Sequence, residues 1–183
     1  MKKITFLFLG FLSITATLRA QQDYYANQDT VSGTNVTYRV DRRYTGSYEI
    51  NNITNTRTNQ PMRLLNGAFA PPPFEQYKVH RIGDHAPIAK AILQEVLTPT
   101  ELSAMINQTD SFDTGYVIDH NGNIVEVCFA FAANPPFSSI SPDKWYSIEQ
   151  KIKQRMKYTV SDKGKTVQYV IVSNVWGVRY MLK

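Results

Sequence analysis

The sequence predicts an α+β fold, in which an antiparallel sheet carries helices packed on one of its faces. Two observations point to this class: apolar residues follow strand-like patterns over 115–131 and again over 167–175, and a stretch with apolar residues at helical spacing, 142–156, lies between them. The order hairpin, helix, hairpin within one short domain is typical of α+β proteins. The chain has 183 residues, so one ordinary domain accounts for most of it.

Residues 1–20 have the features of an export signal. Two lysines precede an apolar run over 4–16, and a small residue closes the segment, so we expect cleavage between Ala20 and Gln21. The run is shorter than the roughly 20 apolar residues that a membrane-spanning helix needs. The sequence therefore predicts an exported protein, periplasmic or extracellular, without stable membrane insertion after cleavage; a retained anchor is the alternative.

The charge distribution argues against nucleic acid as a partner. The formal net charge is +5, but three basic residues and no acidic one lie in the signal, so the remaining chain carries only +2. So small a charge in an exported protein does not fit nucleic-acid binding. Residues 84–138 hold one basic and seven acidic side chains, whereas 139–183 hold nine basic and three acidic ones. Either the two parts complement each other, or the basic part faces an anionic polysaccharide or lipid.

Residues 21–75 are expected to form a polar N-terminal arm, β-rich or extended, that precedes an α+β domain at 84–183. The stretches 36–40 and 48–50 alternate like half-buried strands. Aliphatic residues are sparse there, which favours edge strands or an arm laid on the main domain over an independent core. Three prolines at 71–73 then predict a stiff connector.

Two helices are expected at the start of the α+β domain. Asp84 is placed to cap the first helix, whose apolar face continues to Val96. Thr98 and Glu101 have the spacing of a capping box for the second helix, with Pro99 at its first position.

The rest of the domain is expected to be strand, helix and strand. Asn121-Gly122 between two apolar runs is a strong hairpin signal, because both residues tolerate positive φ. Ser141 is placed to cap a helix that has an apolar stripe on one side. Further strands are expected at 158–160, 167–175 and 178–182.

These residues carry a resemblance to a known family. The run Gly115-Tyr-Val-Ile-Asp-His-Asn-Gly-Asn-Ile-Val-Glu-Val, the helix around 148–153 and the strand pair after it resemble the C-terminal domain of TonB-type proteins. They are more similar still to secreted Bacteroidetes proteins of unknown function that carry such a module. The resemblance covers 84–183 and implies the fold and an exposed sheet edge that accepts a peptide. Because a Tyr-Pro signature is absent and cleavage of the signal is expected to leave no anchor, it does not imply the energy-transducing role.

The sequence offers little for catalysis or cofactor binding, and we expect neither. It contains no Gly-x-Ser-x-Gly elbow and no phosphate-binding glycine loop. Cys128 lies in an alternating apolar run, where a buried and inert thiol is expected. The best metal-ligand spacing is His80, Asp84 and His85, but zinc usually needs a third or fourth protein ligand, so the expectation is no metal. His120 falls in the predicted hairpin turn.

The predicted function is therefore a non-enzymatic, exported binding protein that recognises a protein or peptide by strand addition at an exposed sheet edge. Candidate residues for this edge are Tyr158 and Val160 in one strand, Tyr169 in the next, and Tyr180 beside it. The alternative is a hydrolase or lyase acting on glycan, which the compartment and the tyrosine content favour. A third possibility is a metal-dependent role through His80 and His85.

One modification signal lies in the arm. Asp29-Thr30-Val31 resembles the short acceptor pattern of Bacteroidetes O-glycosylation, which makes Thr30 a candidate glycosylation site.

Overall fold

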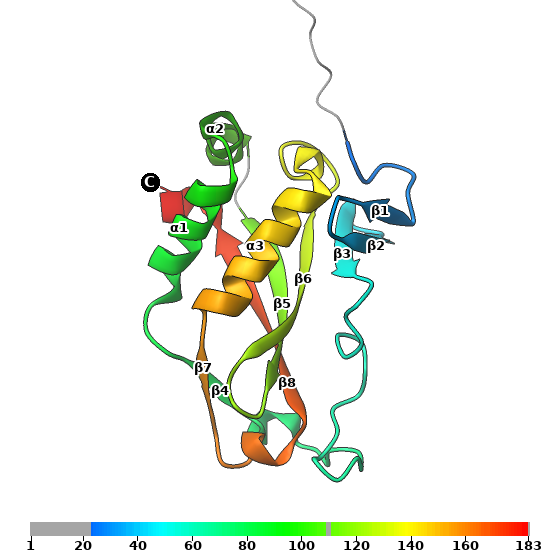
Figure 1. Cartoon of the computed structure of the whole chain (residues 1–183), viewed down its shortest axis with the longest axis vertical. Helices are drawn as coiled ribbons and strands as arrows, with labels where there is room; N and C mark the ends of the chain where they lie inside the picture. The colour runs from blue at the N-terminus through cyan, green and yellow to red at the C-terminus, as the bar shows by residue number, and fades with distance from the viewer. Residues whose placement is uncertain (1–22, 109–110, 183) are drawn as a thin grey trace, which may run out of the picture.

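The computed structural model describes residues 23–108 and 111–182, which form a sheet layer covered by a helix layer (Figure 1). The main sheet has six strands, and every neighbouring pair is antiparallel. In spatial order they are β1 (Thr30–Ser32), β2 (Thr37–Arg43), β3 (Ser47–Asn52), β6 (Ile124–Ala132), β5 (Ser111–Asp119) and β8 (Tyr169–Gly177).

The long helices lie in front of this sheet in Figure 1, and the predicted α+β class is confirmed. The helices of the described chain are α1 (His85–Val96), α2 (Pro99–Gln108), α3 (Pro142–Arg155) and α4 (Val178–Leu182). A second sheet has two short strands, β4 (Val79–Arg81) and β7 (Tyr158–Val160). Single 3-10 turns, η1 (Phe74–Gln76), η2 (Phe137–Ser139) and η3 (Gly164–Thr166), connect the larger elements.

The core between the two layers is aromatic. Trp145 of α3 is fully buried, and its ring packs against Phe112, Phe129 and Phe131, with centroids 5.3, 4.7 and 5.0 Å away. Aromatic pairs at such distances add stabilisation beyond the burial of their area. The apolar stripe predicted for α3 is therefore the face that covers β5 and β6.

The N-terminal strands belong to the same sheet as the rest of the chain. β3 pairs with β6 over five residue pairs, which makes β1, β2 and β3 one side of the main sheet. The Tyr25 hydroxyl donates a hydrogen bond to the Ile140 carbonyl over 2.8 Å, so the start of the described chain is fixed to the loop before α3. The arm and the α+β part thus share one core.

Helices α1, α2 and α3 each begin directly after the residue that was predicted to cap them. The Asp84 carboxylate accepts a hydrogen bond from the Ala86 amide over 2.9 Å. Thr98 and Glu101 form the predicted reciprocal pair, with the Thr98 amide donating to the Glu101 carboxylate over 2.8 Å. Ser141 is the N-cap residue of α3, but its side chain makes no capping bond.

Two local predictions were wrong in detail. Residues 178–182 form α4 instead of a strand, because Val178, Met181 and Leu182 pack against the core at helical spacing. In the β5–β6 hairpin only Gly122 has positive φ, at 86°, and Asn121 does not. The Asp119 carboxylate accepts from the amides of Asn121 and Asn123 instead, over 2.9 and 2.8 Å, and this side chain shapes the turn.

Three buried tyrosines are expected to make the fold sensitive to alkali. Burial raises the pKa of Tyr25, Tyr38 and Tyr116 above its ordinary value near 10. The folded chain keeps these phenolic protons, whereas the unfolded chain releases them above pH 10. Their contribution to stability is therefore complete below pH 10. As the pH rises above 10, each tyrosine lowers the free energy of unfolding by up to about 1.4 kcal/mol per pH unit.

Urea unfolding measured between pH 8 and 11 checks this expectation. The Tyr25→Phe variant should show a shallower loss above pH 10, and Tyr44→Phe, which changes a fully exposed tyrosine, should follow the wild type. A free energy of unfolding that stays constant from pH 9 to 11 would contradict the expectation.

Candidate functional site

The outer edge of β8 is the most conspicuous unsatisfied feature of the described chain. The strand order ends at β8, and the backbone groups of residues 169–176 make no hydrogen bond to a described backbone group outside their ladder with β5. The strand contains no charged residue and no proline. The side chains of Ile171 and Val175 are 38% and 70% exposed. β8 therefore presents a long apolar edge.

The direction of the free backbone groups follows from one contact. The Thr114 hydroxyl on β5 donates to the Asn174 carbonyl over 3.2 Å, so this carbonyl is directed at β5. Backbone groups of successive strand residues point to opposite edges. The N–H and C=O groups of Ser173 and Val175 therefore point away from β5, toward the open side.

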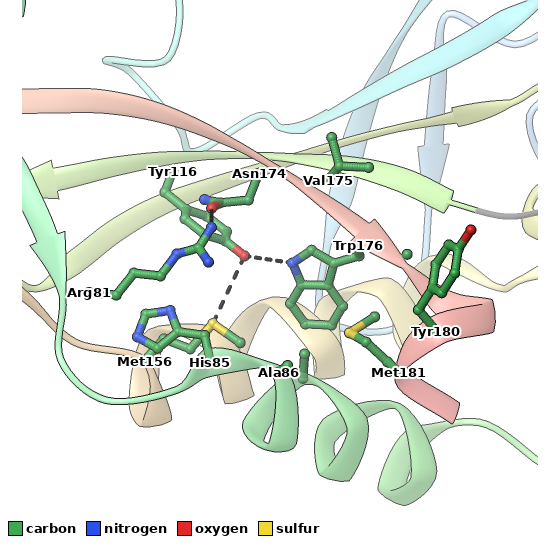
Figure 2. Close-up of a pocket in the computed structure, with 12 residues that line it drawn as sticks. Arg81, His85, Ala86, Tyr116, Met156, Asn174, Val175, Trp176, Tyr180 and Met181 are labelled. Carbon is green, nitrogen blue, oxygen red and sulfur yellow. Dashed lines mark hydrogen bonds between the residues drawn. The ribbon is translucent and has the colours of Figure 1, made fainter. Parts of the chain in front are cut away.

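A pocket of about 190 Å³ lies beside this edge, between β8, α4, the start of α1 and Arg81 of β4 (Figure 2). Figure 2 shows Arg81, His85 and Asn174 at one end of the pocket, with Tyr180 at the other end and Trp176 between them. Apolar walls are supplied by Ala89, Met156, Trp176 and Met181. Its size and lining suit one bulky apolar side chain.

Hydrogen bonds fix the polar groups of the pocket. The Trp176 Nε1 atom donates to the Tyr116 hydroxyl over 3.0 Å, and that hydroxyl points at the Met156 sulfur, 3.9 Å away. Burial raises the pKa of Tyr116, so its hydroxyl stays neutral. At the open end, the Arg81 guanidinium donates to the Asn174 side-chain oxygen, and Asn174 donates in turn to the Tyr158 hydroxyl over 3.4 Å.

His85 is a structural member of this site. Its ring is buried, packs edge-on against Tyr158 at 5.1 Å, and places Nε2 3.2 Å from the Lys157 carbonyl. Burial lowers the pKa of His85, so the ring is neutral at physiological pH and Nε2 acts as the donor. His80 is exposed on β4, and the described residues contain no group of three or more His, Cys, Asp or Glu that could hold a metal ion.

The residues predicted for the binding edge lie in three different settings. Tyr158 and Val160 are on β7, where they pair with Arg81 and Val79 of β4 in the small sheet. Tyr169 begins β8, but its side chain is buried and donates to the Pro61 carbonyl over 3.0 Å. Tyr180 is on α4, 88% exposed, at the mouth of the pocket. Two of the predicted residues therefore lie at the pocket: Tyr180 lines it, and the Tyr158 hydroxyl accepts a hydrogen bond from Asn174, which also lines it.

The other predicted positions lie away from the pocket. Thr30 is exposed at the start of β1, where it pairs with Arg39, and its glycosylation stays a prediction. Ala20 and Gln21 lie outside the described residues. Cys128 is only partly buried, in contrast to the buried thiol that was expected, but desolvation still raises the pKa of its thiol to about 11.

Sequence reasoning missed several residues of this site, namely Arg81, Tyr116, Asn174 and Met181. Arg81 and Asn174 belong to strands that are 93 residues apart in the sequence, so no local pattern connects them. The sequence pointed to this region only through Tyr158 and Tyr180, which were expected beside an open edge.

Comparisons with known proteins support the fold and go no further. No family model matches the chain, and no curated protein is similar to it. Among solved structures, the crystal structure of a DUF5043 family protein from Bacteroides uniformis is similar, with a TM-score of 0.68 at 18% sequence identity. The match covers 84% of this chain and 87% of that chain. The fold is thus shared with a Bacteroides protein whose family name denotes a domain of unknown function. No helix among the described residues is long and apolar enough to cross a membrane.

Proposed function

We propose that the chain is an exported, non-enzymatic binding protein that captures an extended segment of another protein as an additional strand on β8. The observation that supports this is the β8 edge itself, nine residues long and free of charge and proline. Natural proteins usually shorten, charge or cover such edges, because an open one pairs with other chains. The opposite edge of the sheet follows this rule, since β1 has only three residues.

The pocket adds a means of selection to this edge. In strand addition, backbone hydrogen bonds supply affinity, and pockets for alternate side chains supply specificity. The outward backbone groups of Ser173 and Val175 lie beside the pocket that Trp176 and Tyr180 border. A partner strand can therefore pair with β8 and insert one apolar side chain at the same time.

The sequence gives two further lines of support for the proposal. Residues 1–20 have the pattern of an export signal, which supports a binding event in the periplasm or outside the cell. The resemblance of 84–183 to TonB C-terminal domains implies a sheet edge that accepts a peptide. Glycan cleavage receives less support at the pocket between β8, α4 and α1, because none of the residues that line it is a carboxylate and acid–base catalysis of that reaction ordinarily uses two.

Replacing Ser173 with proline is expected to abolish partner capture and leave the fold intact. The Ser173 amide points away from β5, so the substitution removes a donor from the open edge without breaking the ladder. Affinity capture from a cell-envelope extract, with the chain from Gln21 onward as bait, should show a partner whose yield falls at least tenfold with this variant.

The control for this experiment is Ser173→Ala, which keeps the amide and should capture as well as the wild type. Circular dichroism and thermal unfolding must show that both variants are folded. Undiminished capture by Ser173→Pro would sink the proposal, as would an empty capture from well-folded wild-type bait.

A further inference from the structure

We infer that the segment captured by β8 carries a bulky apolar side chain for the pocket and, within a few residues of it, an acidic side chain for Arg81. The inference rests on the proposed function, because it names the chemistry of the strand that the β8 edge receives. It follows from the combination of an apolar pocket with a cation at its open end.

The apolar half of the recognition comes from the pocket walls. Trp176 and Met156 are buried at its base and held by the Tyr116 hydroxyl, so they form a fixed surface. Val175 and Tyr180, both mostly exposed, stand at the mouth. An inserted side chain would bury these exposed apolar surfaces as well, which favours a large residue over a small one.

The acidic half comes from Arg81. Its guanidinium group has five donors, and one of them bonds to the Asn174 side chain. Among the described carboxylates, none forms an ion pair with Arg81. The cations of α3 differ from it, since Lys144, Lys151 and Arg155 are each paired with a carboxylate on α1 or α2. Arg81 thus offers exposed donors that match a carboxylate from outside.

A second copy of the chain fits this edge less well. If two β8 strands paired antiparallel with Ser173 opposite Ser173, the two Asn174 residues would lie only two positions apart along the strands. The two Arg81 side chains, each bonded to its Asn174, would then also lie close together. Like charges so close oppose the contact. Charge complementarity therefore favours an acidic segment of another protein as the occupant.

The test uses synthetic peptides as probes. The set consists of acetylated and amidated ten-residue peptides of alternating Thr and Val, labelled with a dye, each with one Phe and one Asp at separations of one to four residues in either order. A matching set has Asn in place of Asp. Fluorescence anisotropy should show that at least one Asp peptide binds the full chain, and that its Asn counterpart binds at least tenfold more weakly.

Protein variants separate the two halves of the inference. Arg81→Gln should remove the preference for Asp over Asn, Arg81→Lys should retain part of it, and Lys78→Gln, which removes an exposed cation just before β4, should leave it unchanged. Ala86→Phe, which fills the mouth of the pocket from the exposed side of α1, should weaken binding of every peptide in the set. Thermal unfolding of each variant shows whether it is folded.

The outcomes distinguish this inference from the proposed function. If Arg81→Gln keeps the Asp preference while Ser173→Pro abolishes binding, the inference is overturned and strand addition stands. If Arg81→Gln removes the preference while Ser173→Pro binds normally, carboxylate recognition stands and strand addition is overturned. If no peptide binds the wild type, or if sedimentation shows a dimer that Ser173→Pro dissociates, the inference is overturned.

Discussion

Replacing Glu126 with alanine is expected to lower the free energy of unfolding by about 4 kcal/mol, one of the two largest single-residue effects that we expect in this chain. The Glu126 carboxylate on β6 is buried, and it accepts hydrogen bonds from three successive backbone amides, those of Thr56, Arg57 and Thr58, over 2.9 to 3.0 Å. The Thr58 hydroxyl donates a further bond over 3.0 Å. Alanine would leave all these donors without an acceptor and release the segment that follows β3.

Urea unfolding and hydrogen exchange together measure this effect. The amides of Thr56, Arg57 and Thr58 should exchange much faster in Glu126→Ala, whereas the β5–β6 ladder stays protected. The matched control is Glu49→Gln on the neighbouring strand, because Glu49 pairs only with the exposed Arg43 side chain. A loss of stability no greater than that of the control would show that the carboxylate is not needed to hold the segment.

The parts of the fold that were predicted correctly are those encoded by neighbouring residues. Asp84, Thr98 and Glu101 each act on an amide within three positions, so their capping roles can be read from spacing alone. The apolar stripe of α3 and the Asn-Gly hairpin are likewise local patterns. Such signals are enough for the α+β class and for most helix and strand positions.

The parts that were missed depend on contacts across long stretches of sequence. The Glu126 clamp joins residues 68 to 70 positions apart, and a glutamate in an alternating strand gives no sign of the loop that will cover it. Residues 178–182 were predicted as a strand, but they form α4, in which Val178 is buried and the partly buried Met181 packs against the core. The pocket combines four separate segments for the same reason.

The candidate site shows the same division. An exposed sheet edge was expected from the pattern of the last strands, but which strand has only one neighbour is a property of strand order, and that order is 1-2-3-6-5-8. β8 remains in place with one partner strand because it is also fixed from the helix side, where Trp176 bonds to Tyr116 and Val178 is fully buried. A rigid strand with one free edge is a suitable template, because little order must be imposed on it when a segment pairs with it.

Replacing Glu149 with alanine should likewise lower the free energy of unfolding by about 4 kcal/mol, and the loss should be felt first in the N-terminal strands. Glu149 of α3 is completely buried, and its carboxylate accepts hydrogen bonds from the Tyr38 hydroxyl on β2 over 2.9 Å and from Lys153 over 2.5 Å. Alanine would leave two buried donors, the Tyr38 hydroxyl and the Asn52 side-chain amide, without this acceptor, whereas the partly exposed Lys153 can turn to water. Hydrogen exchange should then show early loss of protection in β2. Tyr38→Phe, which removes one of these bonds, should cost about 1 kcal/mol.

Glu95 provides the control for this prediction. Its carboxylate makes more ion-pair contacts than that of Glu149, with Lys151 and with both terminal nitrogens of Arg155, but it is exposed on the surface of α1. Because exposed ion pairs are screened by water and salt, Glu95→Ala should change the urea midpoint only slightly. If Glu95→Ala and Glu149→Ala destabilise the chain equally, burial is not what gives Glu149 its importance, and the attachment of the N-terminal strands to α3 must depend on the apolar contacts of Tyr25 and Val40 instead.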